Sequence, residues 1–83
     1  MEKTNLTGTE KQIAWAEQLR TAAIEAAEAS IVDDETRELY APTIDAFRRV
    51  GRADTWIRFG RRPVDAIYNW RNMLVAEGLP EPE

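Results

Sequence analysis

Arginine, the side chain best suited to bind phosphate, is concentrated in one stretch of this 83-residue chain. Residues 47–63, FRRVGRADTWIRFGRRP, hold six arginines against one acid, Asp54, which gives a local charge of +5. These arginines are Arg48, Arg49, Arg52, Arg58, Arg61 and Arg62. A guanidinium group can donate two hydrogen bonds to one phosphate, and an exposed Trp56 or Phe59 could stack on bases. The stretch therefore predicts a contact with phosphate or with an acidic partner.

The remainder of the chain makes nucleic acid the second choice. The net charge is -4 and the sequence pI is about 4.8, whereas domains that bind nucleic acid are usually basic. The alternative interpretation is that the arginines form ion pairs with the acids of the first predicted helix and of residues 33–38. Such pairs would form within one molecule or between copies.

Carboxylates form the second candidate surface. They are Glu10, Glu17, Glu25 and Glu28 on the first predicted helix, followed by Asp33 and Asp34. At 100° per residue, Glu10, Glu17 and Glu28 fall in one line. A row of carboxylates can imitate nucleic-acid phosphates and occupy a basic channel on another protein. The alternative is an ordinary solvated helix face. Adjacent acids at a helix start normally cap it, so we expect no metal site.

The residue types that perform most enzymatic chemistry are missing. The chain contains no histidine and no cysteine, which removes the usual general base, the commonest metal ligands and the strongest nucleophile. Ser30 has no histidine to activate it, and nothing in the sequence indicates a shifted pKa for Tyr40 or Tyr68. We expect a protein that is not an enzyme and that needs no cofactor.

Length and composition predict a single domain that covers residues 1–83, with residues 1–6 and 79–83 frayed at its ends. Hydrophobic residues make up 43% of the chain, and no apolar run approaches the roughly 20 residues that span a bilayer. The polar start, MEKTNLTGTEKQ, lacks the apolar core of a signal peptide. We expect a soluble protein of the cytoplasm.

Four helical segments are expected to position these charges. The first spans about residues 9–31, with a capping box from either Thr7 with Glu10 or Thr9 with Gln12. The others are residues 33–50, 53–60 and 63–78, each bounded by Asp, Gly or Pro. Pro42 lies inside the second segment, where it predicts either a kink near Glu38 or a restart of the helix. The fold class is an all-α single-domain bundle of three to four helices.

The large side chains of so small a domain are expected to lie inside it. The predicted core comprises Trp15, Leu19, Phe47, Trp56, Ile67 and Leu74. On the last helix, the predicted buried stripe comprises Val64, Ile67, Tyr68, Arg71, Leu74 and Val75, with Trp70 and Met73 at its edge.

Two segments resemble a known family. LTGTEKQIAWAEQLR, residues 6–20, is similar to a segment of the form L-T-G-[ST]-x-K-Q-x-x-W-A-x-x-[IL]-R in uncharacterised small proteins of phages and other bacterial mobile elements. ADTWI, residues 53–57, is similar to an Ala-x-x-Trp-Ile segment that follows it there. The family usually has an aromatic residue where this chain has Thr55. The resemblance implies a mobile-element origin and a helical domain, and it implies no catalytic residue.

Several residues of the first segment have structural interpretations. Thr7 and Glu10 would cap the helix, Gly8 would permit a tight entry, and Ile13 with Trp15 would be buried. Packing explains a second group less easily, and these residues could pair with Glu17, pair with a neighbouring helix or meet a ligand. They are Lys11, Gln12 and Arg20.

Together, these features predict a protein that binds a macromolecule without catalysis. The most concrete hypothesis is an inhibitor of a host defence complex, such as a CRISPR effector, that acts by charge-complementary protein binding in the bacterial cytoplasm. The first alternative is a nucleic-acid-binding accessory protein that uses Arg48–Arg62. The second is a dimerisation or targeting module.

Overall fold

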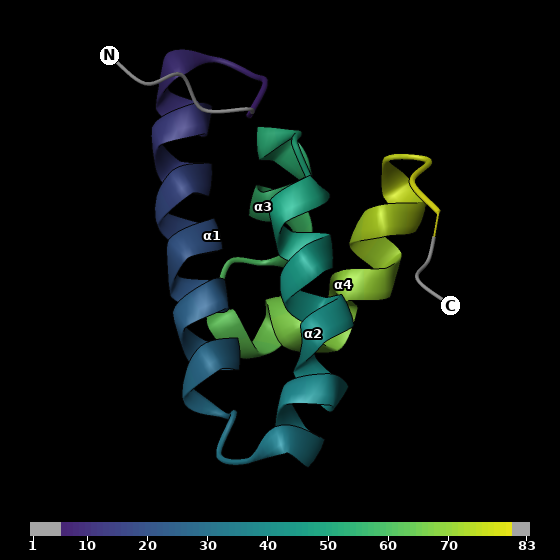
Figure 1. Cartoon of the computed structure of the whole chain (residues 1–83). Coiled ribbons are helices and arrows are strands. Elements are labelled where there is room, and N and C mark those ends of the chain that lie inside the picture. Colours follow the sequence, from purple (N-terminus) through teal and green to yellow (C-terminus); the bar gives the residue numbers. More distant parts are fainter. Residues whose placement is uncertain (1–5, 81–83) are drawn as a thin grey trace.

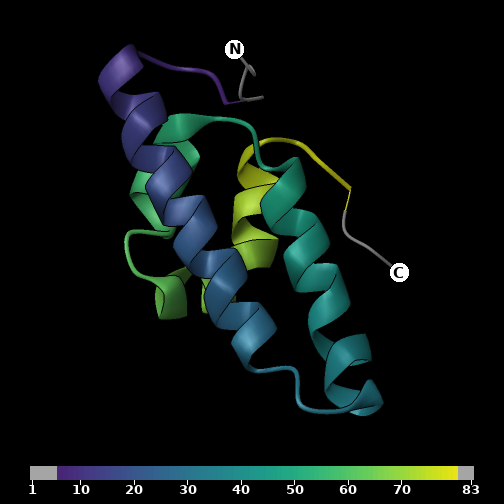
Figure 2. The same cartoon turned by 60° about the vertical axis from the view of Figure 1, so that its left-hand side comes forward.

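The structure, a computed structural model, describes residues 6–80. Its four helices are α1 (Glu10–Ala29), α2 (Asp34–Arg49), α3 (Ala53–Phe59) and α4 (Pro63–Ala76). In Figures 1 and 2, α1 and α2 form an antiparallel pair, while α3 packs against α1, and α4 crosses beside α2. The predicted all-α fold is confirmed, and the described residues contain no strand beyond one isolated bridge between Thr7 and Arg52.

Local sequence signals set the helix boundaries. Thr9 caps α1: its Oγ1 accepts the N–H of Gln12, and the Gln12 side chain accepts the N–H of Thr9. Of the two predicted capping boxes, the one from Thr9 is therefore the one that forms. Asp33 caps α2 through the N–H of Thr36 at 2.9 Å, and Pro63 occupies the first turn of α4.

The second helix is continuous through Pro42. Helical backbone extends from Asp34 to Arg49 without a break, so a restart of the helix at Pro42 is excluded. Proline removes one backbone hydrogen bond from the helix interior, but α2 still buries Ile44 and Phe47 against α1 and α4. We infer that this packing holds the two halves of α2 together.

The core is centred on two aromatic rings. Trp56 and Phe47 are fully buried, and their ring centroids lie 5.3 Å apart at an interplanar angle of 54°. Leu74 of α4 is also fully buried, and Leu19 and Ile67 pack against this core from its edge. The inner face of α1 consists of small residues, which allow the other helices to approach closely. These are Ala16, Ala23 and Ala27.

Trp15 does not belong to the core, which corrects the prediction. Its side chain is 43% exposed, and it lies one residue, or about 100°, from the buried Ala16 on α1. Because the alanines already fill the narrow space between α1 and its neighbours, the large indole is placed at the rim of the interface.

The predicted stripe of α4 is correct in part: Leu74 is buried and Ile67 packs against the core, but other members face solvent. Tyr68 is 81% exposed, Val75 65% and Val64 48%. The buried face instead comprises Ala66, Trp70, Met73 and Leu74. Apolar residues occupy most of the circumference of α4, so periodicity alone did not select the face that meets α1, α2 and α3.

The ends of the described chain are tied to the core. Leu6 is buried, and the neighbouring Thr7 accepts the N–H of Ala53 and donates its own N–H to Gly51. Leu79 packs against the core and donates its N–H to Leu74 at 2.9 Å. Leu6 and Leu79 thus differ from the expectation of frayed ends, whereas residues 1–5 and 81–83 lie outside the described part of the chain.

Candidate functional site

The two segments that carry the family resemblance contact each other. The loop before α1 pairs with the start of α3 through the bridge between Thr7 and Arg52. Gly8 has φ +144, and a Cβ there would lie 3.1 Å from the Cβ of Ala53. Only glycine adopts this backbone conformation readily and permits so close an approach. We infer that the two segments form one structural unit.

Arg20 belongs to the same unit. Its guanidinium donates a hydrogen bond of 2.6 Å to the carbonyl oxygen of Val50, which also accepts the indole N–H of Trp56 at 3.1 Å. Burial lowers the pKa of Arg20 from its ordinary value, and the charges of Glu17 and Glu77 oppose that shift. Gln12 and Arg20 therefore have structural roles, and of the three unexplained residues Lys11 is the one that packing does not use.

Trp15 and Arg61 form a contact that the sequence did not predict. The Arg61 guanidinium lies 5.6 Å from the centroid of the exposed indole, within the range of a cation–π interaction. Arg61 also donates to the carbonyl of Ile57 at 2.9 Å. The one feature of the sequence that indicated an exposed Trp15 was its position beside the alanine face of α1 and not on it.

The arginine stretch divides into two groups at opposite ends of α3. Arg48, Arg49 and Arg52 lie before this helix, while Arg58, Arg61 and Arg62 lie on its last turn or after it. From Arg52 to Arg58 there are six residues, about 9 Å at 1.5 Å per residue. The stretch therefore presents two groups of arginines along α3.

Most of these arginines have partners in nearby parts of the chain. Ion pairs join Arg49 to Asp45 (3.7 Å), Arg52 to Asp54 (3.2 Å) and Arg62 to Asp65 (3.0 Å). The Arg58 guanidinium lies 5.8 Å from the centroid of its neighbour Phe59.

The acids that these arginines meet are not those expected from the sequence. Arg48 lines a hollow between α1 and α2 together with Glu28, Arg37 and Asp45. This arginine therefore lies near an acid of α1. The three ion pairs of this stretch seen among residues 6–80 use other carboxylates, on α2, α3 and α4.

The aromatic rings proposed for base stacking are mostly inside. Trp56 is fully buried and Phe59 is half-buried against the core. Among the aromatic residues of α1 and α3, Trp15 is the one that presents substantial surface beside a guanidinium. In the described parts of α1 and α3, Trp15 is thus the ring exposed for a stacking contact.

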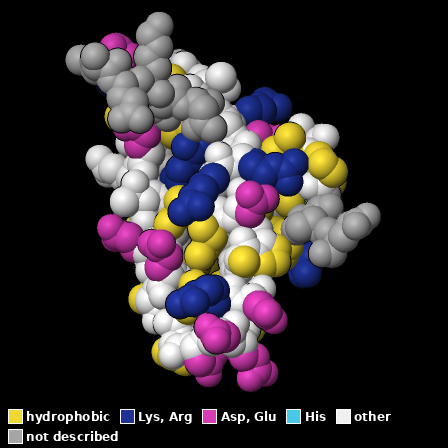
Figure 3. All heavy atoms as spheres, viewed as in Figure 1, with side chains coloured by type: hydrophobic (Ala, Val, Ile, Leu, Met, Phe, Trp, Pro, Cys, Tyr) yellow, Lys and Arg dark blue, Asp and Glu magenta, His cyan; other side chains and the backbone are white. Residues whose placement is uncertain are grey.

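The predicted acidic face is exposed along its whole length. Its members are Glu10, Glu17, Glu25, Glu28, Asp33 and Asp34, all on the surface. Among the described residues, ion pairs of this set are limited to Asp34 with Arg37 at 3.3 Å, and Glu17 contributes to the electrostatics of Arg20. Figure 3 shows several acidic side chains clustered at the end where α1 meets α2, and others distributed over the rest of this face.

Asp33 has a local structural role within that face. Hydrogen bonds from the backbone N–H and the hydroxyl of Thr36 lower the pKa of the Asp33 carboxyl. The carboxylate thus stays charged while it caps α2.

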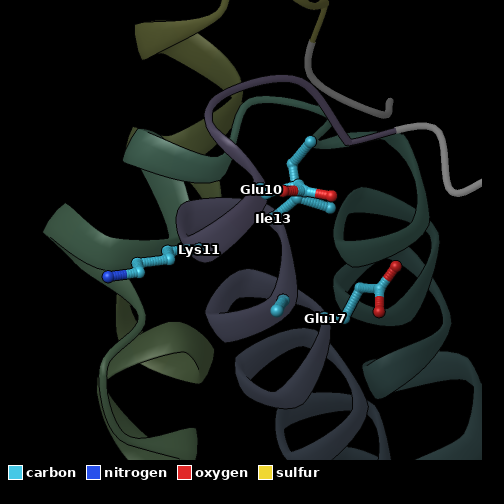
Figure 4. A pocket seen from close by; sticks show the side chains of 5 residues that line it. Glu10, Lys11, Ile13 and Glu17 are labelled. Carbon is cyan, nitrogen blue, oxygen red and sulfur yellow. The ribbon is translucent and has the colours of Figure 1, made fainter.

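One surface hollow lies along α1 and has two acids and a lysine in its lining. It is lined by Glu10, Lys11, Ile13, Ala14 and Glu17, all from α1. Figure 4 shows Glu10 and Glu17 on one side of the helix and Lys11 directed to the other. Within residues 6–80, no group of three acidic side chains is arranged to hold a metal, and no helix is long and apolar enough to cross a membrane.

No protein-family model, curated protein or solved structure matches this chain.

Proposed function

We propose that this chain is a non-catalytic binding protein of mobile-element origin. Its most concrete role is inhibition of a host defence complex that handles nucleic acid, such as a CRISPR effector. The contact surface is the acidic face of α1 together with the α1–α2 turn, which engages a basic channel on the partner.

The observation that carries this proposal is the row of exposed carboxylates without cationic partners. Glu10, Glu25 and Glu28 form no ion pair with any described residue. From Glu10 to Glu28, the row extends about 27 Å along α1, which is 18 residues at 1.5 Å each. Carboxylates that are not neutralised within their own molecule are available to a basic surface elsewhere.

The state of the arginines supports the choice of the acidic face. Arg49, Arg52 and Arg62 form ion pairs with described residues, and α3 lies between the two groups of arginines. Exposed ion pairs are weak, so they do not prevent another contact, but they reduce the charge presented outward.

The test combines binding and inhibition. A tagged chain is incubated with extract from bacteria that carry an active CRISPR defence system, and transformation by a plasmid that this system targets is measured in cells that express the chain. The triple variant Glu10→Gln, Glu25→Gln, Glu28→Gln removes three charges and keeps good helix formers. We expect it to lose both effector capture and inhibition.

The matched control replaces Arg58, Arg61 and Arg62 with glutamate. We expect this variant to retain both activities. Loss in the arginine variant together with full activity in the glutamine variant would overturn the assignment of the contact to the acidic face. Absence of capture and of inhibition for the unmodified chain across several defence systems would refute the inhibitor role itself.

Trp15 and Arg61 favour a second candidate function, binding of single-stranded nucleic acid. Filter binding to DNA and RNA at low and moderate salt tests it. Micromolar binding that weakens steeply with salt and is lost in Trp15→Ala would favour this second candidate. No detectable binding at low salt would eliminate it.

A further inference from the structure

The outer face of α4 presents an apolar stripe that no part of the described chain covers. Val64, Tyr68 and Val75 are all exposed, and Arg71 lies among them. In Figure 1, the later turns of α4 form the right-hand edge of the molecule. Tyr68 is 81% exposed, so most of its ring would meet water in an isolated molecule. A stripe of this kind on a small acidic protein suggests a surface for association.

The spacing of the stripe is that of a helix-pairing seam. Val64, Tyr68, Arg71 and Val75 are separated by four, three and four residues, the alternation found at the a and d positions of a coiled coil. The four side chains fall within about 60° of one another around the helix.

The same spacing is symmetric about its centre. In an antiparallel pair of identical helices related by a twofold axis, residues opposite each other have numbers that add to a constant. With a sum of 139, Val64 faces Val75 of the second copy, and Tyr68 faces Arg71 of the second copy. Each apolar residue meets an apolar residue, and each guanidinium meets an aromatic ring.

Arg71 is already oriented for such a contact. Its guanidinium lies 4.4 Å from the ring centroid of Trp70, and it forms no ion pair within residues 6–80. A guanidinium is planar and can stack on rings at both faces. Tyr68 of the second copy would cover the outer face, which would place the cation between two rings.

Charge along the seam permits self-association at this face. Residues 62–77 contain Arg62, Asp65, Arg71 and Glu77, two bases and two acids, so the segment is neutral although the chain carries -4. By the same sum, Asp65 would fall opposite Leu74 and Arg62 opposite Glu77 of the second copy, so no like charges oppose each other along the segment. The acidic face of α1, by contrast, would repel its own copy.

The groove between α2 and α4 adjoins the seam. This hollow of about 410 Å³ is lined by Leu39, Pro42, Ile67, Trp70 and Arg71 among others. It gives a second copy additional apolar surface beyond α4 itself. From Val64 to Val75, the seam is about 17 Å long, so the contact belongs with weak interfaces below roughly 1,200 Å².

We infer that two copies of this chain associate in solution through α4, paired antiparallel along Val64, Tyr68, Arg71 and Val75. This inference is independent of the proposed inhibitor role.

Sedimentation equilibrium over a range of protein concentrations tests the association. We expect a reversible dimer with a dissociation constant on the order of 10–100 μM. Tyr68→Glu should weaken it at least tenfold. Val32→Glu is the matched control, because it adds the same charge at an apolar residue that is 80% exposed and remote from the seam in sequence. A monomer at all concentrations up to about 1 mM, or equal weakening by both variants, would overturn the inference. Circular dichroism checks that both variants stay folded.

Single cysteines test the orientation, because the chain has none of its own. Val64→Cys and Val75→Cys are purified separately and oxidised alone or as an equal mixture. The antiparallel seam predicts a disulfide-linked dimer in the mixture and little in either protein alone. Efficient linkage of Val64→Cys with itself would show a parallel pair and contradict the model.

Discussion

The guanidinium of Arg20 donates a hydrogen bond to the carbonyl oxygen of Val50 across 2.6 Å, which fastens the middle of α1 to the loop between α2 and α3. The same oxygen accepts the indole N–H of Trp56. The carbonyl of Val50 thus accepts one hydrogen bond from α1 and one from α3. Arg20, which lies in the segment that resembles the family, therefore helps to hold the buried Trp56 in place.

Replacement of Arg20 by methionine should destabilise the fold. It removes the charged donor to Val50 while it keeps most of the aliphatic packing, so we expect a loss of about 1.5–3 kcal/mol. Urea unfolding followed by circular dichroism measures the change. Arg58→Met is the control, because Arg58 is exposed and should change stability by less than about 0.5 kcal/mol. Equal effects of the two variants would contradict the role assigned to Arg20.

Glu77, at the end of α4, binds the loop that leads into α3. Its carboxylate accepts the N–H groups of Gly51 and Arg52, both at 3.0 Å. Glu77→Ala leaves both N–H groups without this acceptor, and we expect a loss of about 1–2 kcal/mol in the free energy of unfolding. Glu25→Ala, on the exposed face of α1, should cost much less. If both variants unfold at the same urea concentration, these two hydrogen bonds contribute nothing to stability.

The two tryptophans of the family-like segments should behave oppositely. Trp56→Ala opens a cavity against Phe47 and removes a buried hydrogen bond, so we expect a loss of about 3–5 kcal/mol. Trp15→Ala removes a side chain that is 43% exposed and should cost less than about 1 kcal/mol. Thermal unfolding compares them. A larger loss for Trp15 would mean that the indole at residue 15, and not the one at residue 56, anchors the core.

Acidification should weaken the cap of α2. Hydrogen bonds from Thr36 lower the pKa of Asp33 in the folded state, so its stabilising contribution is full above the unfolded pKa of about 4 and declines as pH falls through the lower folded value. In the variant Asp33→Asn, the amide side chain caps without titrating. The difference in melting temperature between the native chain and this variant should therefore be larger at about pH 7 than at about pH 2.

Asp34→Asn serves as the comparison for this titration. Asp34 is exposed and pairs with Arg37 over 3.3 Å, without capping a helix. This variant removes a carboxylate next to Asp33 and leaves the cap of α2 in place. A difference for Asp33→Asn that stays constant from pH 7 to pH 2 would contradict the predicted linkage.

Much of the fold followed from local sequence. Thr9 with Gln12, Asp33 before α2, and Pro63 at the start of α4 are signals that act within one turn, so they predicted helix starts correctly. The predicted first helix extended to residue 31, two residues too far. In the structure α1 ends at Ala29, and Ser30 is its C-terminal cap. Pro42 was ambiguous, since proline weakens a helix locally while packing decides whether the helix continues.

The candidate surfaces were predicted less completely. The acidic residues of α1 were correctly expected on the surface, because a helix that buries its alanine face turns its charged side chains toward solvent. The arginines were expected as one stretch, but α3 separates them in space and their partners are Asp45, Asp54 and Asp65. These partners lie four, two and three residues away in sequence, so the sequence held a local signal for the pairs that the prediction did not use.

The sequence by itself determined the helical class, the starts of α1, α2 and α4 and the absence of histidine and cysteine chemistry, because these depend on neighbouring residues and on composition. Tertiary structure alone decided that Trp56 lies inside and Trp15 at the rim, and that α4 turns Trp70 inward and Tyr68 outward. Both α1 and α4 have apolar residues on more than one side of the helix, so helical periodicity is compatible with several buried faces. The free energy of packing all four helices together selects one of them.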